Sequence, residues 1–309
     1  NFRKYNWTWP ITGKGLGTLS LSSALTQSDD VVFYQVGQKL DQVDKNLLPN
    51  LARAFGLGSA TGIELAESAG NIPDPNKGLW RPGDAINMVI GQGDVLASPI
   101  QITDMMAAIA NGGQLVKPWL VRRVVDPATG QVLAASQPTP VRRAVSPETA
   151  ALVTRWLEGV VSDPDGTGKR ARLPGWRVAG KTGTAQKADP VSGGYSADRH
   201  LSSFVGFAPA EAPRIAIGVF IDEPRGEVYG GEVAAPVFRE IAAHALQVRG
   251  AALVNNAAVA PRGAVDGAAA GELADAIRVN GEAPVLLGGS FLRATRAWSA
   301  PRRILNTSP

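Results

Sequence analysis

Cysteine is absent from this 309-residue sequence, and histidine occurs only twice. The lack of thiols excludes disulfide bonds, thiolate catalysis and cysteine–zinc sites. His200 and His244 form neither a metal-binding pair nor a Ser-His-Asp pattern, and no G-x-S-x-G segment occurs. Acyl-transfer chemistry, if the chain takes part in it, must therefore use lysine rather than histidine as the base. We expect no metal site and no cofactor.

Long apolar runs and strong charge are also missing. No run of about 18 apolar residues occurs, so the sequence predicts no membrane-spanning helix. The net charge is +4, and the densest basic cluster, residues 169–172, is too short to indicate a nucleic-acid surface. The first residue is Asn1, without a signal-peptide pattern, and we expect the chain to be truncated at its N-terminus.

The residues that are present predict a folded domain over 1–250, because 44% of the sequence is hydrophobic. Residues 251–309 are rich in Ala, Gly and Arg and have weak periodicity, so we expect a mostly disordered tail. Apolar periodicity and capping residues predict helices over 21–40, 47–55 and 237–248, and helices that start at Pro99 and Pro147. In the helix from Pro147 we expect one buried face: Leu152, Val153, Trp156, Leu157, Val160 and Val161.

Strand signals fall into two groups. Residues 121–126 and 131–135 flank a Pro-Gly-containing turn, which is typical of a hairpin. Residues 176–184, 201–208 and 214–221 predict an antiparallel meander. The region from Phe55 to Gly93 is otherwise interpreted as a loop.

The stretch 176–186 carries the most informative side chains. Trp176, Val178 and Gly180 alternate with polar or small residues, so we expect a strand that ends in Lys181-Thr-Gly-Thr184. Its edge then presents an ammonium, two hydroxyls and a glycine that lets a ligand approach the backbone. Such an edge is suited to bind a carboxylate and to donate an N–H to a carbonyl oxygen.

The same residues also match a phosphate-binding pattern. Gly175 to Thr182 fits G-x-x-x-x-G-K-[ST], and residues 214–222 offer a possible magnesium-binding strand. A phosphate loop needs an apolar strand before it and a helix after it. The basic segment 169–172 precedes it here and the Gly183 region follows, so we regard nucleotide binding as a remote alternative.

A second polar motif interrupts the helix predicted over 21–40. Ser28, Asp29 and Asp30 lie at the break, where Asp29 or Asp30 can act as the N-cap of the next helix. That structural role and a catalytic role both remain open on the pattern alone.

These two motifs resemble those of the class B penicillin-binding proteins, the D,D-transpeptidases that cross-link peptidoglycan. Lys181-Thr-Gly183 is similar to their third signature, and Ser28-Asp29-Asp30 to their second. The resemblance extends in order over about residues 10–248. It includes further blocks: Gly91–Gly93, Ser98–Gln101, Gly166–Gly168, Ser203–Pro209, Tyr229–Gly231 and Ala234–Phe238.

The resemblance implies an α+β fold, with an antiparallel sheet flanked by helices and a helical subdomain. It implies catalytic roles for Ser28, Asp30 and Lys181. Ser28 would relay a proton, Asp30 would orient the network and contact the substrate peptide, and Lys181 would supply positive potential. Thr182, Gly183 and Thr184 would bind substrate, and the Thr184 N–H would form half of the oxyanion hole. Ser28 and Lys181 are therefore expected to lie within hydrogen-bond reach in one cleft.

One element of the family pattern is missing, because no serine is followed by a lysine three residues later. We therefore expect the S-x-x-K nucleophile and the membrane anchor to precede this fragment, which alone is expected to be inactive. The resemblance implies D-Ala-D-Ala stem peptides and β-lactams as ligands, and no nucleic acid. It also implies a parent on the periplasmic face of the bacterial inner membrane, partnered with a membrane glycosyltransferase in cell division or cell shape. The alternatives are a non-catalytic module that binds penicillin or peptidoglycan, and a β-lactam sensor or β-lactamase.

Overall fold

The computed structural model describes residues 4–78, 80–189, 194–247 and 256–260. The helices are α1 (Trp9–Thr12), α2 (Leu21–Gln27), α3 (Asp30–Val43), α4 (Leu47–Ala54), α5 (Pro82–Met88), α6 (Pro99–Ala110), α7 (Pro147–Ser162), the 3-10 turn η1 (Lys169–Ala171) and α8 (Gly230–Gln247). The strands are β1 (Gln114–Lys117), β2 (Arg123–Val125), β3 (Val132–Ala135), β4 (Thr139–Arg143), β5 (Ala179–Ala188), β6 (Tyr195–Ala208), β7 (Ile215–Asp222) and β8 (Asn256–Ala260). None of the helices in these ranges is long and apolar enough to cross a bilayer.

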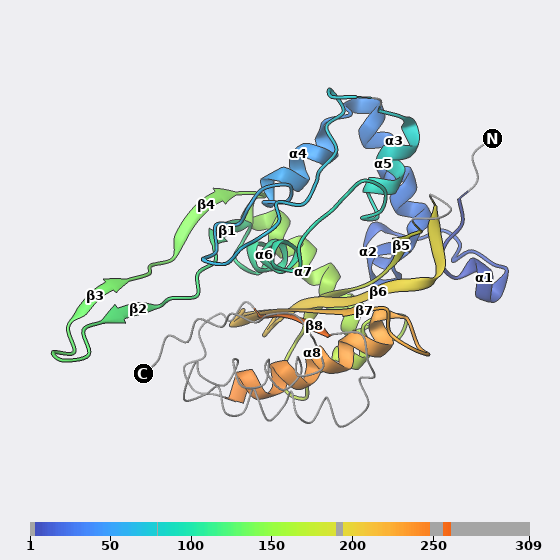
Figure 1. The fold of residues 1–309 in the computed structure, drawn as a ribbon. Coiled ribbons are helices and arrows are strands. Elements are labelled where there is room, and N and C mark those ends of the chain that lie inside the picture. Colours follow the sequence, from blue (N-terminus) through green and yellow to red (C-terminus); the bar gives the residue numbers. More distant parts are fainter. Residues whose placement is uncertain (1–3, 79, 190–193, 248–255, 261–309) are drawn as a thin grey trace.

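A four-stranded sheet in the order β5-β6-β7-β8 organises the fold, with α8 on one face and α6 and α7 on the other (Figure 1). The strands β5, β6 and β7 are antiparallel neighbours, which confirms the predicted meander. On the α8 face, Phe204 and Phe238 are fully buried and their rings meet edge to face at 4.8 Å. On the other face, Phe207 and Leu157 belong to a second apolar cluster. Because both faces are covered, β7 is buried along nearly its whole length.

A smaller helical subdomain is built from α3, α4 and α5, with a core of Leu57, Ile72 and Met88. The described segments therefore have the expected α+β architecture. The interpretation of the region from Phe55 to Gly93 as loop was wrong for α5, which is short and begins at Pro82. A seven-residue helix has too few turns to show a clear apolar period.

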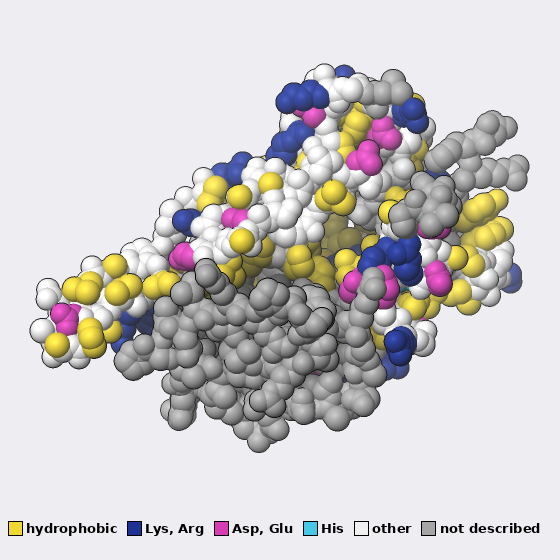
Figure 2. Space-filling model, in the orientation of Figure 1, with side chains coloured by type: hydrophobic (Ala, Val, Ile, Leu, Met, Phe, Trp, Pro, Cys, Tyr) yellow, Lys and Arg dark blue, Asp and Glu magenta, His cyan; other side chains and the backbone are white. Residues whose placement is uncertain are grey.

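The arm, residues 119–143, extends away from this body (Figure 1). It contains the predicted hairpin, β2 with β3, and next to it β1 pairs with β4, a pairing that the sequence did not predict. Every residue of β2, β3 and β4 is exposed. Figure 2 shows hydrophobic side chains along the arm. The exposed aliphatic residues of the arm include Leu133, which is 62% exposed.

Several predicted boundaries differ from the structure, and β6 begins at Tyr195, six residues before the predicted 201. The strand expected from Trp176 begins at Ala179, and it does not end at Thr184 but continues to Ala188. The last helix starts at Gly230, before the predicted 237, and accommodates Pro236 inside it. Residues 256–260, inside the predicted tail, form β8 parallel to β7. The rest of the predicted tail, 251–255 and 261–309, lies outside the described residues, so its disorder stays a prediction.

Candidate active site

Ser28 lies in the short turn between α2 and α3. It has a left-handed backbone, φ 56° and ψ 45°, an arrangement that costs a non-glycine residue roughly 1–3 kcal/mol. The turn is fixed on both sides: the Asp29 N–H donates to Ala24 O at 2.8 Å, and Asp29 Oδ1 accepts from Val32 N at 2.7 Å. Asp29, rather than Asp30, is therefore the N-cap of α3. The hydrogen bonds of Asp29 therefore hold Ser28 in this strained turn.

Lys181 lies on the first half of β5, opposite Val205 of β6. Its Nζ donates to Ser28 Oγ at 2.7 Å and to the Thr182 carbonyl at 3.0 Å. The predicted proximity of Ser28 and Lys181, which are 153 residues apart, is thus confirmed. Burial lowers the pKa of Lys181 from 10.5 to about 8, against an opposing contribution from the Asp30 charge. Lys181 is half-buried and internal to β5, whereas the sequence predicted a strand that ends in Lys181-Thr-Gly-Thr184.

Asp30 is the first residue of α3. Its Oδ2 accepts from the Trp7 N–H at 3.1 Å. Burial raises the pKa of Asp30, the Trp7 N–H opposes that rise, and the Asp29 charge adds to it. Among the described residues Asp30 has no hydrogen bond to Ser28 or Lys181, so it acts on the ammonium through its field. Burial is the main cause that raises the pKa of the Tyr34 phenol to about 12, and the charges of Asp30 and Asp29 add to this rise.

Thr182 and Thr184 point to the α8 face of the sheet. Thr182 Oγ1 shares a 2.8 Å hydrogen bond with Thr167 Oγ1, and Thr184 Oγ1 accepts from the Gly230 N–H at 3.1 Å. Gly183 lies between them, and a Cβ there would come within 2.5 Å of Ser203 Oγ. Within the described part of the chain β5 pairs only with β6, so no described strand covers its other backbone edge. The six predicted site residues are therefore gathered at this open edge and the adjoining turn.

Four further residues support these side chains, and the sequence offered no specific signal for them. Asn6 and Trp7 bind the Ser28–Asp30 turn from a loop segment. Thr167 and Gly230 hold the threonines of β5. Thr167 and Gly230 lie in the glycine-containing blocks that contributed to the family resemblance, but no role was predicted for them. Asn6 and Trp7 precede the predicted helix and have no periodic pattern around them.

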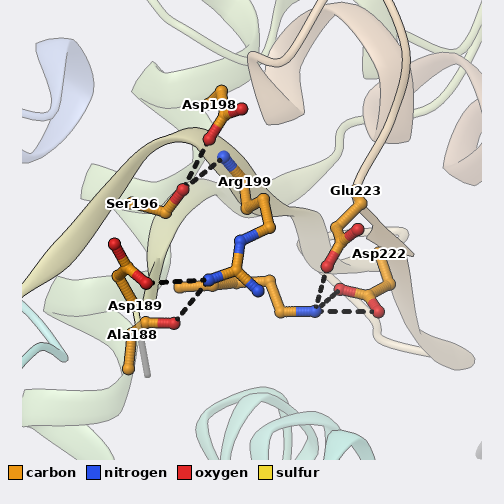
Figure 3. Close-up of polar contacts among 8 residues, drawn as sticks. Ala188, Asp189, Ser196, Asp198, Arg199, Asp222 and Glu223 are labelled. Carbon is orange, nitrogen blue, oxygen red and sulfur yellow. Dashed lines mark hydrogen bonds and ion pairs between the residues drawn. The ribbon is translucent and has the colours of Figure 1, made fainter. Parts of the chain in front are cut away.

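The far end of β5 carries a separate charged cluster (Figure 3). Lys187 Nζ lies 2.8 Å from Asp222 Oδ1 and 2.8 Å from Glu223 Oε1, so it ties β5 to the end of β7. Arg199 donates to the Ala188 carbonyl at 3.1 Å and lies near Asp189. In this cluster Lys187 and Arg199 each lie beside a carboxylate, and Asp198 accepts from the Ser196 hydroxyl at 2.6 Å, so we interpret it as a structural tie of the hairpin (Figure 3).

The phosphate-loop alternative fails on geometry. Gly180 and Lys181 are internal to β5, and the chain continues as a strand through Thr184 to Ala188. A phosphate loop would have to leave a strand before Gly180 and enter a helix after Lys181. The segment has neither feature, and the pattern match is accidental.

Comparison with known proteins agrees with this geometry. The family model described as the penicillin-binding protein transpeptidase domain matches residues 3–243. This chain belongs to the penicillin-binding protein transpeptidase family. It is 35% identical over 234 residues to stage V sporulation protein D of Bacillus subtilis, covering 75% of this chain and 34% of that protein. It is 34% identical over 241 residues to the peptidoglycan D,D-transpeptidase PbpA of Mycobacterium tuberculosis, covering 74% of this chain and 44% of that protein.

A solved penicillin-binding protein has the same fold. The crystal structure of penicillin-binding protein 3 from Mycobacterium tuberculosis, complexed with aztreonam, aligns with a TM-score of 0.62 and 34% identity. The alignment covers 72% of this chain and 50% of that one. This chain thus spans about a third to a half of the length of these relatives. It has the Ser28 and Lys181 motifs of the penicillin-binding protein resemblance, and its sequence has no S-x-x-K segment.

Proposed function

We propose that this chain is the C-terminal part of a peptidoglycan D,D-transpeptidase that acts on D-Ala-D-Ala stem peptides through a serine acyl-enzyme. The observation that carries the proposal is the 2.7 Å hydrogen bond from Lys181 Nζ to Ser28 Oγ. It joins two polar motifs from distant parts of the chain at the open edge of β5. The nucleophilic serine and its base lysine would come from an S-x-x-K segment that this sequence does not contain.

Ser28 would relay the proton. While Lys181 is protonated, its ammonium donates to Ser28 Oγ, which leaves the Ser28 hydroxyl hydrogen free to point to another acceptor. That hydrogen would go to the leaving amine of the peptide, and the Ser28 oxygen would regain a proton from the base lysine of the S-x-x-K segment. A pKa of Lys181 near 8 keeps this ammonium mostly charged at neutral pH and sensitive to its surroundings.

The β5 edge would bind the donor peptide. Thr182 and Thr184 supply hydroxyls for the terminal carboxylate, with the field of Lys181 beside them. The Thr184 N–H would form half of the oxyanion hole, and removal of one such donor costs about 3–4 kcal/mol of transition-state stabilisation in acyl-transfer enzymes. Gly183 would let the peptide lie close to the strand, since it has no side chain.

Ligands and location follow from the same proposal. β-Lactams would bind as stem-peptide mimics, and the solved penicillin-binding protein 3 is itself complexed with aztreonam. The complete protein would work on the periplasmic face of the bacterial inner membrane, attached by an anchor outside this sequence. It would be partnered there with a membrane glycosyltransferase, in division or in cell shape.

The first experiment uses a fluorescent penicillin. In a longer protein that joins this chain to its S-x-x-K segment, Lys181→Ala should lower the acylation rate at least about a hundredfold. The same change should shift the melting temperature by only a few degrees, because one half-buried cation contributes little to the core. Unchanged acylation with a large drop in melting temperature would make Lys181 a structural residue and remove this proposal.

Penicillin binding by this chain and by longer proteins distinguishes the transpeptidase from a non-catalytic module and from a β-lactam sensor. Acylation needs a serine activated by a neighbouring base, so we expect no adduct between this chain and penicillin by intact mass. A stoichiometric adduct would require another nucleophile. A longer natural protein without S-x-x-K that still bound penicillin reversibly would favour a non-catalytic module. An acylated protein with no transpeptidase activity on stem peptides would favour a β-lactam sensor.

A further inference from the structure

Asn6 is almost fully buried, at 3% exposure, although it lies in a loop segment before α1. Its side-chain amide makes three hydrogen bonds, two of them to the Ser28–Asp30 turn and one to the next residue, Trp7. Oδ1 accepts from the Asp30 N–H at 3.2 Å and from the Trp7 N–H at 2.9 Å, while Nδ2 donates to Asp29 Oδ2 at 3.0 Å. One amide therefore binds both residues that follow Ser28.

The buried carboxylate of Asp29 needs this partner. Asp29 is itself 3% exposed, and its other oxygen is used as the N-cap of α3 at Val32. A buried carboxylate oxygen without a donor is costly, so the loss of Asn6 Nδ2 would force Asp29 to rotate or admit water. Either change acts on the residue next to Ser28, whose left-handed backbone depends on fixed neighbours.

Trp7 extends the same support across the site. Its backbone N–H binds Asp30 Oδ2, and its indole Nε1–H donates to the carbonyl of Gln27 at 3.2 Å. Its ring lies 5.7 Å from that of Tyr229, the residue before Gly230. The residues before and after Ser28 are thus both bound by the Asn6–Trp7 segment.

We infer that Asn6 is a positioning residue, which holds the Ser28 turn in the one geometry that places the Ser28 hydroxyl on Lys181. Its effect on catalysis rests on the proposed transpeptidase function, but its effect on the Ser28–Lys181 contact does not. Asn6 touches neither the substrate edge nor the reacting atoms, and it acts through Asp29 and Asp30.

Two reciprocal substitutions distinguish positioning from simple packing. Asn6→Asp keeps both acceptor bonds of Oδ1 but places a carboxylate about 3 Å from the Asp29 carboxylate, which is strongly unfavourable unless a proton is shared. Asp29→Asn removes that clash and lets the new amide at 29 donate back to position 6, while its Oδ1 still caps α3. The double variant therefore restores the hydrogen bond between positions 6 and 29 with donor and acceptor exchanged. The bonds of Oδ1 at position 6 and the cap of α3 keep their direction.

The first measurement uses this chain alone and follows the Lys181 ammonium by NMR during a pH titration. The pKa of the wild-type group should be near 8, and Asn6→Ala should raise it, because water that reaches Nζ relieves the burial that lowers it and outweighs the loss of the Ser28 acceptor. The double variant should return to the wild-type value. If Asn6→Ala folds and Lys181 titrates as in the wild type, the inference is wrong.

The second measurement uses the longer protein and the rate of penicillin acylation. Asn6→Ala and Asn6→Asp should each lower the rate about tenfold to a hundredfold, the usual cost of a misplacement near 1 Å. The double variant should recover to within about threefold of wild type, and Asn6→Asp alone should recover partly at low pH, where the two carboxylates share a proton. A double variant as slow as Asn6→Asp would contradict the reciprocal pair.

The two measurements also separate this inference from the function on which it partly rests. A wild-type longer protein that penicillin does not acylate would refute the transpeptidase proposal, while the Lys181 titration would still decide the role of Asn6. A wild-type protein that is acylated, together with Asn6→Ala variants that react at the same rate, would refute the inference alone.

Discussion

The sheet and the arm contain strands of similar composition but of opposite surroundings. β7 is a continuous apolar run buried between α6 and α8, whereas β3 in the arm, also apolar, is exposed throughout. The difference is in coverage: no helix of the described segments packs on β2 or β3. Apolar sequence therefore predicts a strand in both places, but only coverage on two faces fixes the position of the backbone. The candidate site lies on the covered sheet, where its geometry is set by packing.

The largest expected difference between the two regions is in core truncation. Phe204→Ala should lower the free energy of unfolding by about 3–5 kcal/mol, because the ring is fully buried against Phe238. Leu133→Ala on the arm should change it by less than about 0.5 kcal/mol. Urea denaturation of both variants measures this. A large loss for Leu133→Ala would mean that the arm is covered in solution.

A glycine pair tests how closely the site is packed. A Cβ on Gly230 would lie 2.2 Å from the Ser203 carbonyl and 2.4 Å from the Gly183 carbonyl, so Gly230→Ala should cost about 2–3 kcal/mol. Gly83, in α5, has nothing within 4 Å of its Cβ position, and Gly83→Ala should be neutral or slightly stabilising. Melting temperatures of the two variants give the comparison. Equal values would show that β5 and α8 can separate without cost.

The pH dependence of the free energy of unfolding tests whether the covered sheet buries the charge of Lys181. Between pH 8 and 10.5 the unfolded chain keeps a proton on Lys181 that the folded chain has released, so stability should rise with pH in this window. Relative to Lys181→Met, wild type should gain about 1–2 kcal/mol over that range, after allowance for partial exposure. Denaturation at several pH values measures the gain, and the Tyr34 contribution cancels between the two proteins. If the free energy of unfolding depends on pH in the same way in both proteins, the Lys181 ammonium is solvated in the folded protein.

The smallest expected effect concerns the charged cluster at the far end of β5. Lys187→Met should cost about 0.5–1 kcal/mol, and less at high salt, because its ion pairs with Asp222 and Glu223 remain about one-third exposed. The matched control is Lys77→Met, since Lys77 is 85% exposed and lies 3.7 Å from Asp74, and it should have no measurable effect. A loss above about 2 kcal/mol at Lys187 would show that the cluster stabilises more than the hairpin.

The local sequence pattern predicted where helices and strands form better than it predicted which of their residues are buried. The break at Ser28 and the meander were predictable, because capping residues and strand alternation act over a few residues. Leu152, expected on the buried face of α7, is 38% exposed, whereas Leu157 is buried as expected. At about 100° per residue Leu152 lies about 140° around the helix from Leu157, at the edge of the predicted face and outside the part that α2 and β5 cover. Asn6 was not predictable at all, since its role depends entirely on segments that pack around it.

The Ser28–Lys181 hydrogen bond has a consequence for how the protein is made. Its two partners are separated by 153 residues, so the ribosome must produce the whole of the helical subdomain, the arm and α7 after Ser28 before Lys181 exists. The entropy of closing so long a loop must be overcome before the contact forms, and contacts of this kind belong to the slow part of folding. The candidate site therefore cannot assemble before the segment that carries Lys181 has been synthesised. The contact therefore marks a chain in which the helical subdomain, the arm and α7 are already present.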